Sequence, residues 1–453
     1  MKKGVLLILL LFPAAGRAQD RLTLAEAVER AMARFPTVEA ARARQEEAAE
    51  ALGEARAGRL PRGRHTGSAL QYQEPMVVTP IHGFGPGLFP EFDETIGQAT
   101  LTVSYTLFDS GADAARIRTA DAQTLAAGAA VGSSEQVLAR RVAAAYLTVL
   151  GQRQVLDAHD SRRQALEAEL SRVQQRFEVG RAARVEILRA EAALASSEAE
   201  RVRLSSAVDN AERELARLLD VPVEETRSGR LVPVELPDPQ VPLREELREE
   251  LREEMATEGI AASPAVAQAR AQVTAAEAQI SLTRALARPE VRAVGNYNEW
   301  TSSQGDFTGE WNAGLQLTVP LFDLGVTRSR IARAEAAHRA AQEQVRAAEV
   351  QVREDVDRAA AAVEEAEARI ASLGKAVERF AEVARVQKLL LDEGAGTQTD
   401  YLSSEADLLA ARASLADARH AAILARVDLA RAAGRLTPEW LRQNLRSPLE
   451  PVQ

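Results

Sequence analysis

The sequence predicts a mainly α-helical protein with a small β part, built as a tandem duplication of long helical hairpins and β-hairpins. Long stretches without proline carry apolar residues at helical spacing, and a short alternating run precedes each stretch. The pentapeptide LFDSG ends at Gly111, and LFDLG ends at Gly325, 214 positions later. Each marks the point where an alternating run gives way to a helical pattern.

The same offset persists elsewhere in the chain. RFEVG ends at Gly180 and LLDEG ends at Gly394, again 214 positions apart. Upstream of the pentapeptides the offset is 228, as two pairs of prolines show: Pro36 with Pro264, and Pro61 with Pro289. Self-similarity over roughly 200 residues indicates a tandem duplication. The change of offset from 228 to 214 predicts a 14-residue insertion in the first copy, near MVVTPIHGFGPGLFP.

These patterns divide the chain into segments. Two lysines, a short apolar run and small residues predict a signal peptide at 1–18, with a buried N-terminal helix as the alternative. The segments expected after it are a first repeat at 19–235 with a β-hairpin at about 64–108, a linker and charged helix at 236–262, a second repeat at 263–436 with a β-hairpin at about 290–321, and a C-terminal tail at 437–453.

Composition limits the possible functions. The net charge of −10 argues against nucleic-acid binding, because polyanions are bound by basic surfaces. The absence of cysteine removes disulfides and thiolate chemistry and fits an oxidising compartment. The five histidines are scattered, and no nucleophile with its base or nucleotide-binding motif is present. We therefore expect no enzymatic activity, no metal and no cofactor.

Two long helices are expected, one in each repeat. From Gly111 to Gly180 there are 69 steps without proline, and from Gly325 to Gly394 there are again 69. At ~1.5 Å per residue each stretch would form a helix of roughly 100 Å. A glycine between two helical patterns readily ends a helix in the left-handed conformation. Each long helix should therefore be followed by a shorter helix that runs back along it.

The strands are expected where the helical pattern stops. Residues 100–107 and 312–321 alternate, with Leu101 and Val103 on one face and Thr100 and Thr102 on the other. Such alternation suits a transmembrane barrel strand, although a hairpin of a soluble β-sandwich would show it too. Four strands cannot close a wide barrel, and open edges are not tolerated in lipid. If the strands are membranous, three chains would supply twelve.

In order and spacing, these elements resemble the TolC-like outer membrane efflux protein family. The resemblance rests on LTLAEAVERAMARFP near the predicted mature N-terminus, PLFDLG at 320–325 and EGAGTQTDYLSSEADLL at the second helix reversal. It implies a homotrimer in the outer membrane of a Gram-negative bacterium, surrounded by outer membrane lipid. A twelve-stranded β-barrel would continue into a twelve-helix α-barrel tunnel in the periplasm.

The same resemblance implies a passive exit duct in a tripartite efflux pump or a type I secretion system. The duct would dock to a periplasmic adaptor and, through it, to an inner-membrane transporter. Two other classes would share the long helices. A periplasmic adaptor would have one helical hairpin inserted in β-rich domains, and a structural coiled coil would have no β-hairpins. Membrane fractionation would separate the three classes.

The resemblance also places the periplasmic aperture at the helix reversals. In the second copy, Gly394 and Asp400 match the family turn, whereas Leu391 stands where a tyrosine is common. Gly396 stands where some members have a basic residue, and Ser403 where a second acidic residue is frequent. The salt-bridge latch of those relatives is therefore not expected in this chain.

In the first copy, Gly180 and Glu186 occupy the matching positions. Three copies of Asp400 would form an acidic ring at the aperture. The alternative is that Asp400 caps or solvates the start of the returning helix. If Asp400 lies away from the lumen, Glu186 and Glu405 are the next acidic candidates.

Overall fold

A computed structural model describes residues 21–82, 89–228, 231–235 and 245–445. The predicted signal peptide, part of the linker and the end of the C-terminal tail lie outside the described residues. The chain forms two compact units, and each unit combines segments of both predicted repeats. Unit 1 takes its described residues from Met1–Glu39, Ser134–Ser263 and Val352–Gln453, and unit 2 takes them from Ala40–Ser133 and Pro264–Gln351.

Two long helices belong to both units. Helix α3 (Ala112–Glu178) and helix α8 (Val326–Asp392) have 67 residues each. Their first and last residues keep the offset of 214 positions, and their lengths agree with the spacing of the flanking glycines. The prediction of two long, uninterrupted helices is confirmed.

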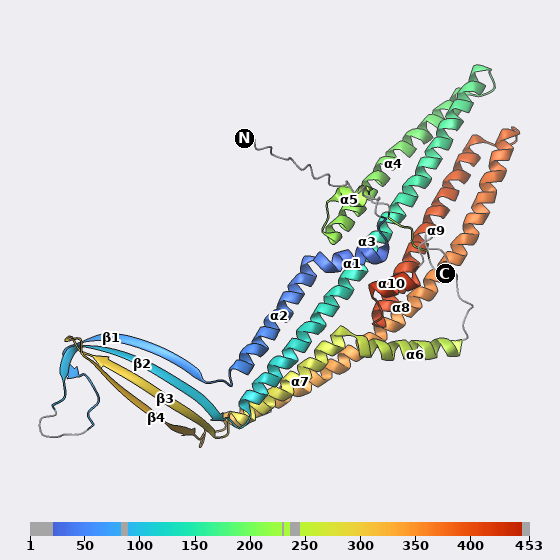
Figure 1. Cartoon of the computed structure of the whole chain (residues 1–453). Coiled ribbons are helices and arrows are strands. Elements are labelled where there is room, and N and C mark those ends of the chain that lie inside the picture. The colour runs from blue at the N-terminus through green and yellow to red at the C-terminus, as the bar shows by residue number, and fades with distance from the viewer. Residues whose placement is uncertain (1–20, 83–88, 229–230, 236–244, 446–453) are drawn as a thin grey trace, which may run out of the picture. The chain divides into compact units, whose positions relative to one another are not determined.

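Unit 1 contains the helical hairpins (Figure 1). After α3 the chain turns into α4 (Arg184–Leu219), and after α8 it turns into α9 (Gln398–Ala432). Each returning helix is about half as long as the helix before it. The other helices described in this unit are shorter: α1 (Leu24–Arg34), α5 (Val223–Ser228), α6 (Glu245–Ala262) and α10 (Pro438–Asn444).

The core of unit 1 lies where α1, α3, α4, α9 and α10 meet. The side chains of Val28, Val142, Leu215 and Val427 are fully buried there. Tyr146 from α3 is also fully buried, and its hydroxyl lies 2.7 Å from the carbonyl oxygens of both Leu22 and Val232. These two carbonyls belong to chain segments joined by a parallel bridge between Leu22 and Leu231. The core thus fixes the start of the described chain.

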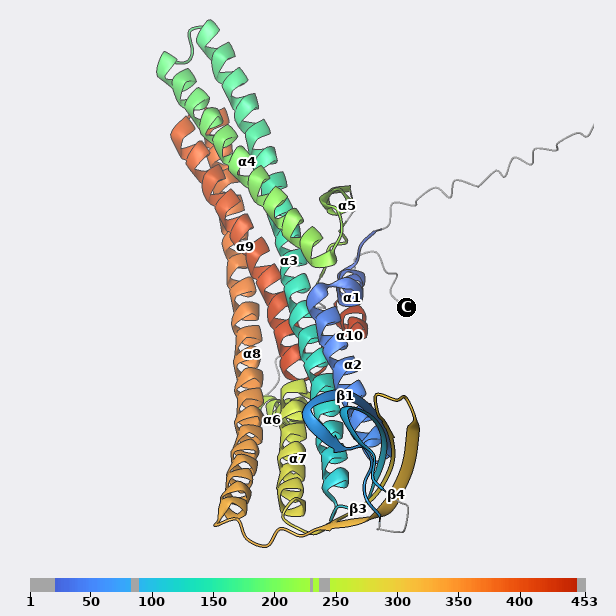
Figure 2. The same cartoon turned by 90° about the vertical axis from the view of Figure 1, so that its left-hand side faces the viewer.

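Unit 2 contains a four-stranded sheet and the helices that precede its hairpins (Figure 2). Helix α2 (Pro36–Ala57) leads to β1 (Arg62–Val77) and β2 (Phe92–Phe108), and α7 (Pro264–Ala285) leads to β3 (Glu290–Thr301) and β4 (Phe307–Thr318). The strand order is β1-β2-β3-β4, and all neighbours are antiparallel. The pairing of β2 with β3 joins the two hairpins into one sheet.

The repeated pentapeptides form the corners between strand and helix. Asp109 accepts hydrogen bonds from the backbone N–H groups of Gly111 and Asp113. Asp323 accepts the same bonds from Gly325 and Thr327. Both glycines have positive φ, 91° and 96°, a backbone conformation that residues other than glycine rarely adopt. The pentapeptide therefore recurs because each copy needs this corner and this helix cap.

The strand expected at 312–321 was placed too far along the chain, since β4 ends at Thr318. Pro320 has no backbone N–H to donate to a ladder, so Val319 and Leu321 lie beyond the sheet. The first copy was expected to be longer through an insertion in a loop, but its strands are longer as well. Strands β1 and β2 have 16 and 17 residues, whereas β3 and β4 have 12 each.

Candidate functional site

The first helix reversal in unit 1 follows the pattern of a glycine helix end. Gly180 has a φ of 73°, and its N–H donates to the carbonyl of Phe177 at 2.9 Å. The N–H of Arg181 donates to the carbonyl of Arg176 at 2.7 Å. This pair of bonds satisfies carbonyls that a helix end otherwise leaves free. The glycine predicted to reverse the chain does so.

The second reversal repeats this geometry. Gly394 has a φ of 75° and donates to Leu391 at 3.1 Å, and Ala395 donates to Leu390 at 2.9 Å. A Cβ atom at Gly396 would lie only 3.0 Å from the Cβ of Leu390. A larger side chain at this position would require Leu390 or the turn to shift by a few tenths of an ångström.

The predicted acidic residues lie in the first turns of the returning helices. The carboxylate of Glu186 accepts the backbone N–H of Ala183 at 3.0 Å. Asp400 is exposed, its N–H donates to the Thr397 hydroxyl at 3.2 Å, and that hydroxyl lies 2.6 Å from its carboxylate. Both acids therefore complement the positive end of a helix dipole. The cap of α9 is the Thr397 hydroxyl, which donates to the Asp400 carboxylate, and that carboxylate lies at the surface.

The other predicted residues of the second reversal differ in exposure. Leu391 is buried, whereas Ser403 is exposed and Glu405 is half-buried. Ser403 makes no hydrogen bond with its side chain in the part of the chain that the structure describes. Leu391 thus presents no exposed side chain at this turn.

A polar cluster that the sequence did not reveal connects the two hairpins. Arg172 on α3 lies 3.2 Å from Glu169 on the same helix and 3.1 Å from Asp392 on α8. The buried side chains of Gln398 and Tyr401, both on α9, lie in the same region. Farther along, the guanidinium of Arg189 on α4 donates to Thr399 on α9 at 3.3 Å. Helices α3 and α8 thus share a group of charges, to which α9 adds polar side chains.

Glu169 is the buried acid of this cluster, with 3% of its side chain exposed. Burial raises the pKa of its carboxyl, because a charged carboxylate is poorly solvated there. Arg172 and Arg176 oppose this rise and Asp392 adds to it. The net direction is upward, so the neutral form of Glu169 is favoured by the fold.

The sheet of unit 2 has one apolar and one polar face. On the apolar face Leu101, Tyr297 and Trp311 lie side by side across three strands. Their side chains are 44%, 46% and 74% exposed. The same face carries Val103, Tyr105, Leu315 and Leu317, which are also exposed. An exposed apolar surface of this kind marks a site of contact with a partner or a membrane.

The polar face carries a ladder of hydroxyl and amide side chains. The Thr102 hydroxyl donates to Asn296 at 2.8 Å, and the Asn296 amide donates to Asn312 at 3.0 Å. One step along the sheet, Thr100 donates to Asn298 at 2.8 Å. These bonds give the polar face fixed side chains that water can still reach. The alternation predicted for 100–107 is thereby confirmed.

Within the residues that the structure describes, no helix is both long and apolar enough to cross a membrane. The described residues also contain no group of three or more His, Asp or Glu side chains placed to hold a metal ion.

Solved structures with the same fold are known. The outer membrane protein VceC from Vibrio cholerae matches with a TM-score of 0.72 and 20% identity, covering 91% of this chain and 96% of that chain. The CmeC outer membrane channel of Campylobacter jejuni matches with a TM-score of 0.74 and 16% identity, covering 92% and 86%. At these identities the comparison shows the fold.

Sequence comparison adds a relative and a family. Protein CyaE of Bordetella pertussis is 30% identical over 242 residues, which are 52% of this chain and 49% of that protein. The match thus spans about half the length of this relative. The model of the outer membrane efflux protein family matches residues 27–220 and 257–435. With most of its length matched in two blocks that follow the duplication, this chain belongs to the outer membrane efflux protein family.

Proposed function

We propose that this protein is a passive exit duct of the outer membrane, formed by three copies of the chain. Four strands from each copy would form a twelve-stranded barrel, and the helices would form a tunnel in the periplasm. Solutes would pass from an inner-membrane transporter and a periplasmic adaptor through the duct to the exterior. The protein would bind no cofactor and catalyse no reaction.

The observation that carries this proposal is the two-faced sheet. In a barrel its apolar face would meet lipid, and its ladder of Thr and Asn side chains would line the interior. Among the described strands, β1 and β4 each have a neighbour on one side only. Their free edges would pair between copies, because lipid leaves no unpaired backbone group satisfied.

Assembly and conduction test the proposal together. The full-length protein, purified from outer membranes in detergent, should elute as a trimer by light scattering. In planar bilayers it should give discrete conductance steps. A monomer that stays soluble without detergent and keeps its full helix content would contradict the proposal, and so would a trimer that never conducts in any condition tested.

We further propose that Asp400 contributes an acidic ring at the periplasmic aperture. Its exposed carboxylate lies six residues past Gly394, at the reversal of a long helix. Three such charges at a narrow opening would favour cations and attract multivalent cations that block the current. Asp400→Asn should reduce cation selectivity and weaken block by trivalent cations added on the periplasmic side.

Glu186→Gln is the variant to compare with Asp400→Asn. It removes the charge of the corresponding acid in the other hairpin and keeps an acceptor for the N–H of Ala183. If Asp400→Asn leaves selectivity and block as they are in the parent, Asp400 serves the start of α9 alone. Glu186 and Glu405 would then be the acids to examine. Trimer stability should change little in either variant, since Asp400 is exposed and the amide that replaces the half-buried Glu186 keeps its hydrogen-bond acceptor.

A further inference from the structure

Arginine is concentrated in unit 2 where the strands meet the helices. The segments 54–65, 109–118, 284–292 and 323–333 together contain twelve arginines and five acidic residues. The chain as a whole has a net charge of −10. This junction is therefore a strongly basic region of an acidic protein, and all twelve arginines are exposed to solvent. A local excess of positive charge attracts anions.

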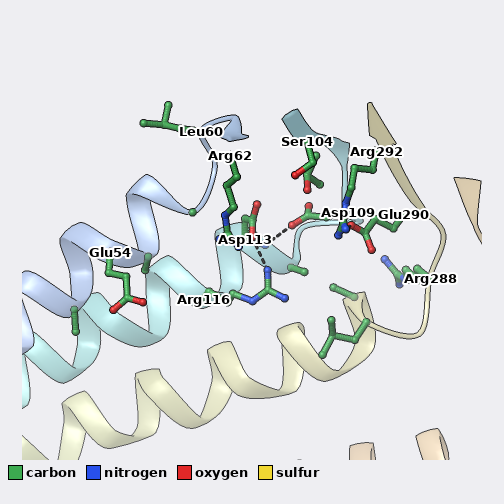
Figure 3. A pocket seen from close by; sticks show the side chains of 17 residues that line it. Glu54, Leu60, Arg62, Ser104, Asp109, Asp113, Arg116, Arg288, Glu290 and Arg292 are labelled. Carbon is green, nitrogen blue, oxygen red and sulfur yellow. Dashed lines mark hydrogen bonds and ion pairs between the residues drawn. The ribbon is translucent and has the colours of Figure 1, made fainter. Parts of the chain in front are cut away.

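A hollow of about 570 Å³ lies within this region (Figure 3). Its walls come from the end of α2, strands β1 and β2, the start of α3, and the chain from the end of α7 into β3. Four arginines line it: Arg62, Arg116, Arg288 and Arg292. In Figure 3, Arg62 descends from β1 beside Asp113 and Arg116, and Arg292 lies near Asp109 and Glu290.

Most acidic residues of the lining already have partners of their own. Both carboxylate oxygens of Asp109 accept backbone N–H groups at the start of α3. Asp113 pairs with Arg116 at 2.5 Å, and Glu290 pairs with Arg292 at 2.6 Å. Glu54 is the acid of the lining that remains outside these contacts.

Two guanidinium groups of the lining remain for a ligand. Arg62 and Arg288 have no ion-pair partner among the described residues. The hydroxyls of Ser104 and Thr106, on the polar face of β2, also line the hollow and can donate hydrogen bonds. Guanidinium groups in a fixed fork, supported by neutral donors, match the oxygen atoms of a phosphate group.

We propose that this hollow binds a phosphate-bearing anion through Arg62 and Arg288. Arg116 and Arg292 have N–H groups beyond those that face their carboxylates, so they add donors without losing their pairs. The phosphate could belong to a soluble anion, which this polar face would meet inside the proposed barrel, or to a lipid headgroup, which would need the hollow to open outward; both present the same oxygen atoms. Binding at this hollow does not require the protein to conduct, so it can fail or succeed independently of the proposed duct.

The first arm of the test uses soluble pyrophosphate. Full-length protein in non-ionic detergent is titrated calorimetrically at low ionic strength, and the parent is expected to bind. The double variant R62Q/R288Q should raise the Kd by roughly tenfold or more, as expected for losing charge-assisted hydrogen bonds. The control is R64Q, which removes one charge from the same face of the same strand outside the hollow. It should raise the Kd much less than the double variant does, because Arg64 does not line the hollow and makes no direct hydrogen bond to an anion held there.

The second arm uses lipid as the probe. Parent, R62Q/R288Q and R64Q are reconstituted in nanodiscs of phosphatidylethanolamine and phosphatidylglycerol, re-extracted, and assayed for retained lipid phosphorus. Pyrophosphate binding that depends on Arg62 and Arg288 supports a soluble anion. Retained phosphorus that falls in R62Q/R288Q but not in R64Q supports a headgroup. Circular dichroism confirms that the variants fold, and the single variant R288Q replaces the pair if the double variant does not.

Two results would overturn the proposal. One is a parent protein that binds neither probe. The other is an R62Q/R288Q variant that matches R64Q in both arms, because the binding would then reflect the general basic field and not the hollow.

Discussion

Glu169 is an acidic side chain that helix packing removes from water. Its raised pKa means that the folded state favours the protonated form more than the unfolded state does. This contribution to stability is therefore complete below the ordinary pKa of 4.5 and is lost as the pH rises through the raised value. At neutral pH the buried charge opposes the packing of α3 against α9, with Arg172 as its compensating partner.

Glu169→Gln should remove this pH dependence, because a neutral amide has nearly the same shape. We expect the variant to unfold at a temperature higher than the parent by roughly 1 to 3 °C at pH 7.5. The difference should vanish near pH 4. Thermal unfolding followed by circular dichroism across this range measures it. A difference that is constant with pH would show that Glu169 titrates normally in the folded protein.

Tyr146 holds two chain segments through one hydroxyl group. Burial raises the pKa of this phenol, so it stays a hydrogen-bond donor at any physiological pH. Tyr146→Phe leaves the carbonyls of Leu22 and Val232 with one donor fewer and should reduce the free energy of unfolding by about 1–3 kcal/mol. Thr148→Val, two residues along α3 at an exposed position, is the control and should change it by about 0.5 kcal/mol or less.

The start of each long helix depends on one aspartate. Asp109→Ala and Asp323→Ala each remove a side chain that accepts two backbone N–H groups. Each substitution should cost about 1 kcal/mol of stability, whereas substitution by asparagine, which keeps one acceptor, should cost less. Because the two corners have the same geometry, the two alanine variants should have similar effects. Hydrogen exchange in the first turns of α3 and α8 would locate the loss.

The elements could be read from the sequence because their signals are local. Glycines at 180 and 394 and the capping aspartates lie within a few residues of the helix ends that they determine. The end of β4 was missed by three residues, since alternation continues past the point where Pro320 interrupts the ladder. The pairing of β2 with β3 has no local signal in the sequence, because the two strands come from different halves of the chain.

The sites were less visible in the sequence than the elements. Arg172 and Asp392 are 220 positions apart, and nothing near either residue indicates that helix packing brings them together. The distance of Asp400 from Gly394 predicts that Asp400 lies at the start of a helix. The turn does not indicate whether its side chain faces a lumen. The basic junction had a readable signal, namely the excess of arginine in four short segments. Only the folded chain brings three of those segments, 54–65, 109–118 and 284–292, to one hollow.

The whole molecule depends on which face of the sheet meets lipid. If three copies form a barrel, each apolar face must lie outward and each polar ladder inward. Leu315 and Gln316 are adjacent on β4, pair with Ala293 and Arg292 respectively, and are both exposed in the single chain. They therefore probe opposite faces of the sheet at the same height.

Leu315→Arg should impair insertion into the outer membrane, because an arginine on a lipid-facing position of a barrel costs about 2–4 kcal/mol at the midplane of the bilayer. Gln316→Arg should insert normally and change the conductance instead, since it would add a charge to the interior. Outer membrane fractionation measures insertion, and planar bilayers measure conductance. Equal insertion of the two variants would show that neither face of β4 contacts lipid, and the barrel would then need a different arrangement of strands.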